Sequence, residues 1–257
     1  MHRFFVPPHW IEAERAWLEG AVALQLARIL RMSPGDQVVL LDNTGREYTV
    51  RLTSFSRDVV EGDVLTVVQG LGEPTVSITL YQGTLKGEKF QWVLQKGTEL
   101  GVATFVPTVC RRSIPRGRDS SDTSRHERWT RIVTEAAEQS GRCRIPQILQ
   151  PMPFQDACKR VEGSGISIIP WEQEGATGLR TVLHQTPSPS MEDSESVSEP
   201  GVNVFIGPEG GFDEEEVEHA RSCGVIPVSL GRRILRSETA AIAVVAAVLY
   251  EVGEMGS

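Results

Sequence analysis

Two glycine-rich segments hold the residue types of this sequence that are best suited to chemistry. The first reads Gly-Pro-Glu-Gly-Gly at 207–211, and the second reads Gly-Arg-Arg-Ile-Leu-Arg at 231–236. Glycine removes side chains and tolerates unusual backbone angles, so backbone N–H and C=O groups can hydrogen bond to an adenine edge or an amino-acid zwitterion. Arginine can hold RNA phosphate or stabilise an anion that forms on a base. The two segments therefore indicate a ligand pocket beside a site that handles negative charge.

The predicted strands place both segments at one edge of a sheet. Apolar runs at 202–206 and 225–230 predict a buried strand before each segment. The loops that follow parallel strands lie at the same edge, where open α/β sheets bind ligands. One glycine segment alone would favour a tight turn without a ligand. Two segments at one edge, the second with three arginines, favour a ligand site.

Two helices are predicted to follow the two segments. Asp213 and Glu216 have the spacing of an N-cap with a capping box, and Ser237 is predicted to cap the second helix. Residues 240–250 are apolar without a break, so we expect the second helix to be buried all round.

Several common sites are excluded by the motifs that the sequence lacks. GxxxxGK(S/T), GxGxxG and GxSxG are absent, which argues against a P-loop nucleotidase, a Rossmann dinucleotide site and a hydrolase nucleophile elbow. The four cysteines form no CxxC pair and the five histidines form no HxxxH pair. We therefore expect no metal site and no disulfide framework.

Composition and charge favour a cytoplasmic protein that contacts RNA. The chain has 257 residues, of which 40% are hydrophobic and 23% charged, as in ordinary globular proteins. No apolar run reaches the ~18 residues of a membrane span, and the N-terminus lacks the apolar core of a signal peptide. The net charge of −8 conceals a basic segment at 111–144, with nine arginines and five acidic residues.

The pattern of predicted elements divides the chain at Glu73-Pro74. Residues 1–72 are rich in short β runs separated by turn signals, which predicts a small β-barrel. Apolar residues at helical spacing from Leu18 to Leu30 predict one amphipathic helix within it. Residues 73–257 alternate between strands and helices, which predicts an α/β domain. The polar segment 184–201 is predicted to be a disordered insertion.

Several motifs together resemble the SPOUT methyltransferases, and more closely the bacterial small-subunit ribosomal RNA methyltransferase E family of uridine N3-methyltransferases. The resemblance covers nearly the whole chain. Its motifs are HRFFV at 2–6, ILRMSPGD at 29–36, QKGTELGV at 95–102, CRRS at 110–113, EAAEQSGR and IPQI within 135–148, GPEGGF at 207–212 and LGRRILRSETA at 230–240. One clear departure is Gln25, where the family usually carries His, so any RNA contact of that His is altered here.

The resemblance implies an N-terminal PUA-like small β-barrel for RNA and a C-terminal SPOUT α/β domain with a deep trefoil knot. It implies S-adenosylmethionine (S-adenosyl-L-methionine) as the cofactor, bound in the knot. It also implies a homodimer in which the partner subunit helps to close each site. The substrate would be one uridine in the 16S rRNA of the small ribosomal subunit.

The same resemblance assigns site residues. Cofactor contacts are expected from Pro170, Trp171, Glu172, Ile206, Gly207, Pro208, Glu209, Gly210, Gly211, Leu230, Gly231, Ile234, Leu235 and Arg236. We expect Arg236 to stabilise the uracil anion and Glu238 to orient Arg236. Glu209 either accepts the proton or only orders its loop. RNA contacts are expected from Arg3, Arg31, Arg111, Arg112, Gln139 and Arg142, although Arg112 and Arg142 could be ordinary surface arginines.

Three other functions stay open at this point. The chain could be a SPOUT methyltransferase that acts on another RNA, such as a tRNA ribose. It could be an RNA-binding assembly factor that binds the cofactor without catalysis. A phosphate-binding structural protein is disfavoured because neither glycine segment supplies a lysine.

Overall fold

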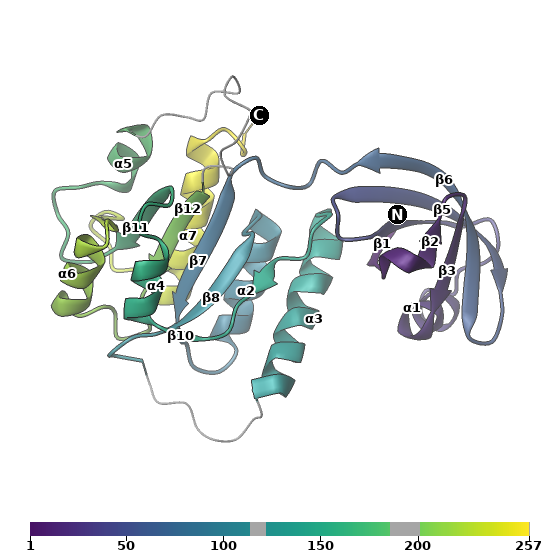
Figure 1. Cartoon of the computed structure of the whole chain (residues 1–257), viewed down its shortest axis with the longest axis horizontal. Coiled ribbons are helices and arrows are strands. Elements are labelled where there is room, and N and C mark those ends of the chain that lie inside the picture. The colour runs from purple at the N-terminus through teal and green to yellow at the C-terminus, as the bar shows by residue number, and fades with distance from the viewer. Residues whose placement is uncertain (114–121, 186–200, 257) are drawn as a thin grey trace. The chain divides into compact units, whose positions relative to one another are not determined.

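The computed structural model describes residues 1–113, 122–185 and 201–256 of the chain. It divides into two compact units. Unit 1 comprises Met1–Glu73 and Thr134–Ile145, and unit 2 comprises Pro74–Val133 and Pro146–Ser257 (Figure 1).

The structure describes only the ends of the segment 184–201, which was predicted to be a disordered insertion. Its first two residues end helix α5 (Leu179–Gln185), and its last residue begins strand β12 (Gly201–Ile206). The remaining positions lie outside the described residues.

Unit 1 is built on a six-stranded sheet that is antiparallel except at one edge. The order is β1-β4-β5-β6-β3-β2, and β1 pairs in parallel with β4. Fully buried leucines from several strands form its apolar core. The β-rich character predicted for the first part of the chain is therefore confirmed. The strands are β1 (His2–Phe5), β2 (Ile11–Glu12), β3 (Arg15–Glu19), β4 (Gln37–Leu41), β5 (Arg46–Phe55) and β6 (Val59–Gln69).

The main helical segment of unit 1 is shorter than the sequence pattern predicts. It consists of α1 (Gly20–Leu24) and the π-helical turn η2 (Gln25–Ile29), and the 3-10 turn η1 (Pro8–Trp10) precedes it. The predicted start at Leu18 is wrong, because Leu18 lies in β3 and is fully buried there. Leu18 fits the helical spacing of the later residues only by coincidence, since its side chain packs in the apolar core of unit 1.

The second half of α3 (Asp122–Ser140) and the residues after it, 134–145, belong to unit 1. The backbone N–H of Phe5 donates to Glu138 Oε1 at 2.9 Å, and the N–H of Ile145 donates to Asn43 Oδ1 at 2.7 Å. Cys143 is buried in a small cluster with residues of β4. These contacts join residues more than 100 positions apart in the sequence.

Unit 2 contains a parallel sheet, which confirms the predicted α/β class. Its order is β10-β8-β7-β12-β11-β13, and the short strand β9 also pairs with β8. All of its pairings between strands are parallel. The strands are β7 (Ser77–Gly83), β8 (Thr104–Val109), β9 (Gln147–Ile148), β10 (Met152–Pro153), β11 (Ile166–Pro170), β12 and β13 (Ile226–Val228).

Helices cover both faces of this sheet (Figure 1). On one face, α4 (Phe154–Arg160) packs against α6 (Glu214–Ser222), and the ring of Phe205 stacks on Tyr81 with centroids 4.4 Å apart. On the other, α2 (Lys89–Leu100) packs against α7 (Ser237–Glu251). None of the helices in the described ranges is both long and apolar enough to span a membrane.

The prediction that the last helix is buried all round is wrong, because Ala243 in its middle and Tyr250 near its C-terminal end are exposed. Ala241, Val244, Val245 and Val248 are buried, whereas Tyr250 is 68% exposed. An aromatic residue of this size keeps a large apolar surface in contact with water.

Candidate functional site

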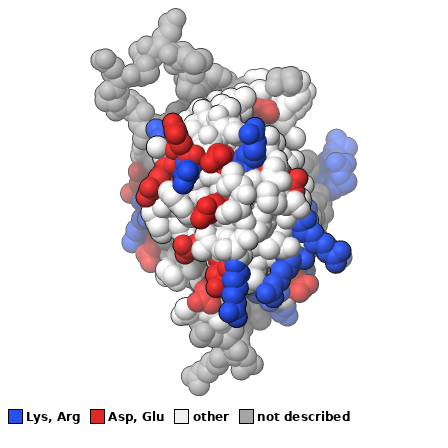
Figure 2. All heavy atoms as spheres, turned by 90° about the vertical axis from the view of Figure 1, so that its right-hand side faces the viewer, with Lys and Arg blue, Asp and Glu red and all other residues white. Residues whose placement is uncertain are grey.

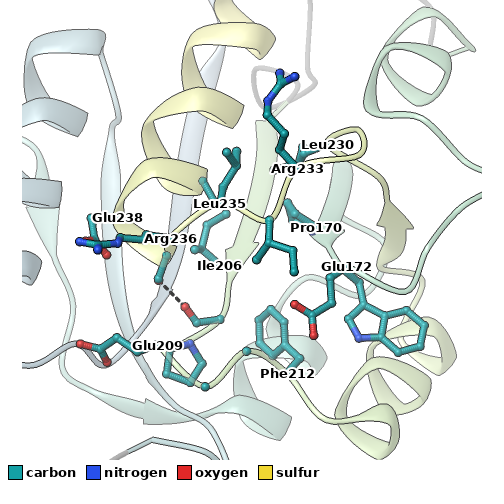
Figure 3. Close-up of a pocket in the computed structure, with 18 of the residues that line it drawn as sticks. Pro170, Glu172, Ile206, Glu209, Phe212, Leu230, Arg233, Leu235, Arg236 and Glu238 are labelled. Atoms are coloured by element: carbon teal, nitrogen blue, oxygen red, sulfur yellow. Dashed lines mark hydrogen bonds between the residues drawn. The ribbon is translucent and has the colours of Figure 1, made fainter.

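A cavity of about 390 Å³ lies at the carboxyl ends of β11, β12 and β13 in unit 2 (Figure 3). Its volume falls within the ~300–1,000 Å³ of small-molecule sites. All the residues that the family resemblance assigned to the cofactor line this one cavity. They are Pro170, Trp171, Glu172, Ile206, Gly207, Pro208, Glu209, Gly210, Gly211, Leu230, Gly231, Ile234, Leu235 and Arg236.

The first glycine loop follows β12 and is anchored to β7 and α7. The hydroxyl of Ser237 donates to the carbonyl oxygen of Gly207. Gln82, fully buried at the end of β7, donates from Nε2 to Ser237 Oγ at 3.0 Å. Ser237 therefore ties the first glycine loop to the first turn of α7. It does not cap this helix, whose N-cap is Arg236, so the predicted capping role of Ser237 is wrong.

Close backbone packing fixes the position of the same loop. A Cβ atom added to Gly83 would lie 2.4 Å from the backbone nitrogen of Pro208. Only a glycine at position 83 allows the loop to approach β7 this closely. At the far end of the loop, Gly211 adopts a left-handed φ of 69° before the helix begins. The helix then starts with the predicted capping box, in which Asp213 and Glu216 bond to each other's backbone N–H groups.

Glu209 is held by donors at the start of α2 and in the residues just before it. Its Oε1 accepts a hydrogen bond from the backbone N–H of Lys86 at 3.1 Å and another from Lys89 Nζ at 3.2 Å. Burial by itself raises the pKa of Glu209, but these donors outweigh it and hold the pKa below its usual value. A carboxylate with a lowered pKa is a weaker proton acceptor. Of the two roles left open by the sequence, the geometry favours ordering of the loop.

Arg236 and Glu238 lie at the start of α7 and line the cavity (Figure 3). The Arg236 side chain is exposed. Glu238 Oε1 is 3.9 Å from Lys89 Nζ. Its Oε2 is buried and has no hydrogen-bond partner among the described residues.

The second loop and the turn after β11 form the remaining walls. Gly231 opens the second loop with a left-handed φ of 98°. Ile234 is 83% exposed and lines the cavity together with Leu230 and Leu235. The backbone N–H of Trp171 donates to the carbonyl oxygen of Val228 at 3.0 Å, which ties the turn to β13. An apolar wall suits a flat heteroaromatic ring.

Further lining residues were missed by sequence reasoning. Each of them except Lys89 lies within two positions of a residue that the family motifs assigned to the site, so these motifs could have indicated it. Lys89 lies in a separate helix and gave no signal of its own. These residues are Lys89, Phe212, Ser229, Arg233, Ser237 and Ala240.

Arg111 and Arg112, two of the expected RNA contacts, bond to the first glycine loop and to the start of the helix after it. Arg112 Nη1 donates to the carbonyl oxygen of Gly210 at 3.1 Å. Arg111 pairs with Asp213 at 3.2 Å and with Glu215 at 2.6 Å. Both arginines therefore support the first glycine loop and the helix that follows it.

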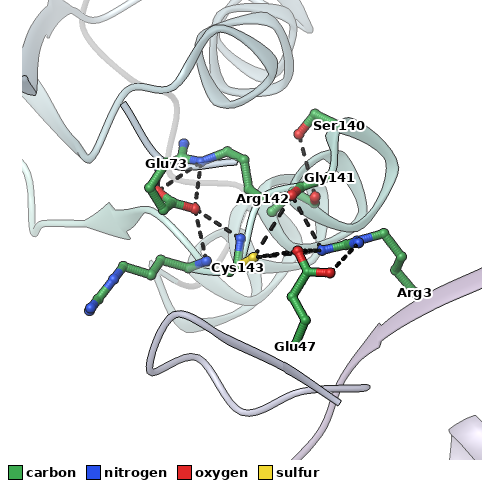
Figure 4. Close-up of polar contacts among 9 residues, drawn as sticks. Arg3, Glu47, Glu73, Ser140, Gly141, Arg142 and Cys143 are labelled. Atoms are coloured by element: carbon green, nitrogen blue, oxygen red, sulfur yellow. Dashed lines mark hydrogen bonds and ion pairs between the residues drawn. The ribbon is translucent and has the colours of Figure 1, made fainter. Parts of the chain in front are cut away.

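The other expected RNA contacts belong to unit 1 (Figure 4). Arg3 binds both carboxylate oxygens of Glu47, at 2.7 and 3.1 Å. Arg142 is only 3% exposed and pairs with Glu73 at 2.7 Å. Arg31 and Gln139 are exposed to solvent. Their contacts with RNA stay predictions.

Charged side chains are mixed on the face shown in Figure 2. Lys and Arg are interspersed with Asp and Glu there, and several Lys and Arg side chains lie along the lower right border of the view. Among the described residues, no group of three or more His, Cys, Asp or Glu is arranged to hold a metal ion.

Two protein-family models match the sequence. One is described as an RNA methyltransferase domain and matches residues 72–249. The other is described as an RNA methyltransferase PUA domain and matches residues 26–65.

Known proteins resemble the chain along nearly its whole length. A ribosomal RNA small subunit methyltransferase E from Bacillus subtilis (strain 168) is 30% identical over 254 residues, which are 98% of this chain and 97% of the relative. A crystal structure of the same enzyme from Neisseria gonorrhoeae, bound to S-adenosyl methionine, is 30% identical, with a TM-score of 0.86 and 100% of both chains covered. A putative methyltransferase from Legionella pneumophila in complex with the same cofactor is 28% identical, with a TM-score of 0.80 and 96% of both chains covered.

Proposed function

This chain belongs to the ribosomal RNA small subunit methyltransferase E family, and we propose that it transfers a methyl group to N3 of one uridine in 16S rRNA. It is an S-adenosylmethionine-dependent rRNA methyltransferase with a PUA-like N-terminal domain and an α/β methyltransferase domain. The uridine and its N3 atom are the part that we propose. The observation that carries the proposal is the convergence of two glycine loops and Arg236 on one cavity.

The residues around the cavity fit the cofactor. Backbone groups of the two glycine loops can bind the adenine edge and the amino-acid part, and Leu230, Ile234 and Leu235 supply an apolar wall. The close packing of Gly83 against Pro208 holds the first loop against β7. When bound, S-adenosylmethionine supplies an activated methyl group on a sulfonium centre.

The chain's own task is to position the uracil and stabilise its anion. N3 of uracil carries a proton at neutral pH and becomes a good nucleophile only when that proton leaves. We propose that Arg236 stabilises the anion, since it lines the cavity as the N-cap of α7, where the helix dipole adds positive potential. Glu238 lies two positions further along the chain, lines the same cavity and would fix its orientation.

RNA recognition is proposed to involve Arg31 and Gln139 of unit 1, which are exposed, as well as Arg3, Arg111, Arg112 and Arg142. The target base would lie in loop RNA of the small ribosomal subunit, where bases can be displaced and read. Phosphate contacts of this kind make binding fall steeply with salt concentration. An enzyme that modifies ribosomal RNA works where ribosomes are assembled, so we propose a cytoplasmic location.

We propose a homodimer in which the partner subunit helps to close each cavity. Exposed apolar side chains at the end of α7 support this proposal: Tyr250 is 68%, Val252 41% and Met255 41% exposed. Light scattering of the purified protein measures the mass directly. A monomer at micromolar concentration would contradict the proposal. The trefoil knot implied by the family resemblance also stays a prediction.

The decisive test is transfer of a labelled methyl group by the purified protein. We expect label in small ribosomal subunits and not in free 16S rRNA, and mass spectrometry of the digested rRNA should place it on N3 of one uridine. Label in tRNA would favour the alternative RNA substrate. Cofactor binding by calorimetry without any transfer would favour the non-catalytic assembly factor.

Arg236→Ala tests the proposed chemistry within this activity. We expect cofactor binding to persist while the single-turnover rate falls by about 10²–10³, the usual loss for one electrostatic stabiliser. A near-normal rate would remove Arg236 from the chemistry.

A further inference from the structure

Lys89 is the first residue of α2 and contacts carboxylates from two different parts of the cavity. Its Nζ lies 3.2 Å from Glu209 Oε1, in the loop after β12, and 3.9 Å from Glu238 Oε1, in the first turn of α7. Lys89 also lines the cavity itself. One ammonium group therefore connects the first glycine loop to the helix whose N-cap is Arg236.

The two carboxylates depend on this ammonium to different degrees. Glu209 has a second donor in the backbone N–H of Lys86. Glu238 is 17% exposed at its side chain, and its Oε2 is buried without a hydrogen-bond partner among the described residues. Each carboxylate is more costly to hold in this partly buried wall when the cation is absent. Loss of Lys89 should therefore disturb Glu238 more than Glu209.

We infer that Lys89 is a positioning residue, which couples the first glycine loop to the start of α7 and so to Arg236. The part that concerns Arg236 rests on the function proposed above. The coupling itself concerns only cofactor binding and the two carboxylates. Glu209 holds the Lys89 ammonium at 3.2 Å, and the ammonium in turn lies 3.9 Å from Glu238, two positions after Arg236.

Three variants of the full chain test a positioning role. Lys89→Met removes the charge and keeps the length of the aliphatic stem. Lys89→Arg keeps a cation and should restore most of the function. Lys96→Met is the matched control, because Lys96 lies about two turns further along the same helix and pairs with Glu99 at 2.7 Å.

We expect Lys89→Met to weaken S-adenosylmethionine binding about three- to tenfold, measured by calorimetry, and to lower the single-turnover methyl transfer rate at saturating cofactor by tenfold or more. Lys96→Met should leave the cofactor affinity unchanged. A Lys89→Met protein with wild-type cofactor affinity and rate would overturn the inference.

A double-mutant cycle separates coupling from a general structural defect. Glu209→Gln and Glu238→Gln should have non-additive effects on cofactor affinity in the wild-type background and additive effects in the Lys89→Met background, because the shared cation is then gone. Additive effects in both backgrounds would overturn the inference.

The cycle also keeps this inference distinct from the proposed function. It is read from cofactor binding alone, so it holds or fails whether or not the methyl group reaches N3 of a uridine. If wild-type protein transfers no methyl group to rRNA, the proposed function fails while the cycle still decides the role of Lys89.

Discussion

The guanidinium of Arg112 donates a hydrogen bond of 3.1 Å to the carbonyl oxygen of Gly210. The two residues also pack closely, since a Cβ atom added to Gly210 would lie 3.1 Å from the Arg112 Cβ. Arg112 follows β8, whereas Gly210 belongs to the first glycine loop after β12. An arginine expected to contact RNA therefore holds the loop expected to contact the cofactor.

Arg112→Ala is predicted to weaken cofactor binding even when no RNA is present. A hydrogen bond from a charged donor at an exposed site contributes about 1 kcal/mol, so the dissociation constant for S-adenosylmethionine should rise about fivefold. Calorimetry measures this change. Arg57→Ala, at an exposed arginine of unit 1, is the control. An unchanged cofactor affinity together with weaker binding of small ribosomal subunits would limit Arg112 to RNA contact.

Gly83→Ala is predicted to displace the first glycine loop. The new Cβ would lie 2.4 Å from Pro208 N and 2.7 Å from Gly207 C, both backbone atoms that cannot move aside independently. Overpacking of this kind costs about 1–3 kcal/mol of the free energy of unfolding. Urea unfolding and cofactor calorimetry should both show the loss. Gly175→Ala is the matched control, because its Cβ would meet nothing within 4 Å, and equal stability of the two variants would contradict the packing argument.

Local features of the site could be predicted from the sequence. The glycine loops, the strands before them and the capping box of Asp213 and Glu216 depend on residues that are close in the chain. Apolar runs and N-cap spacing report such features directly. The same information placed the ligand site at the edge of a parallel sheet.

Contacts between distant segments could not be predicted in this way. Gln82 and Ser237 are 155 positions apart, and neither residue type indicates that one donates to the other. Ser237 was interpreted as a helix cap because serine at a helix start usually bonds to its own backbone. The spacing between Leu18 and the apolar residues after it predicts a helix, but Leu18 lies in strand β3. Spacing along the chain does not distinguish the two cases for a single residue. Lys89 was missed for the same reason, since its partners belong to segments far along the chain.

Arg142→Met is predicted to destabilise unit 1. Arg142 is 3% exposed, and its partner Glu73 also accepts hydrogen bonds from the backbone N–H groups of Cys143 and Arg144. Removing one partner of a buried ion pair leaves the other charge uncompensated, which costs about 3–5 kcal/mol. Because Glu73 keeps backbone donors and is itself partly exposed, we expect a loss of about 2–3 kcal/mol in the free energy of unfolding. Urea unfolding measures it.

Arg57→Met is again the control for a lost exposed arginine. Unchanged stability of Arg142→Met, with weaker binding to small ribosomal subunits, would show that Arg142 acts mainly on RNA.

The ion pair between Arg3 and Glu47 predicts how stability changes in acid. Hydrogen bonds from the Arg3 guanidinium outweigh burial and hold the pKa of Glu47 below its usual value. A carboxyl group with a lowered pKa stabilises the folded state above its ordinary pKa of about 4.3, and this contribution is lost as the pH falls through the lowered value. In Arg3→Met the pKa of Glu47 should rise toward its unfolded value, so the variant should be less stable than the wild type at pH 7. The difference in the free energy of unfolding should shrink as the pH falls through the lowered pKa of Glu47 in the wild type. Urea unfolding between pH 7 and pH 3 measures this narrowing, and Arg57→Met should follow the wild-type curve. Parallel curves for Arg3→Met and the wild type would mean that the pair adds no pH-dependent stability.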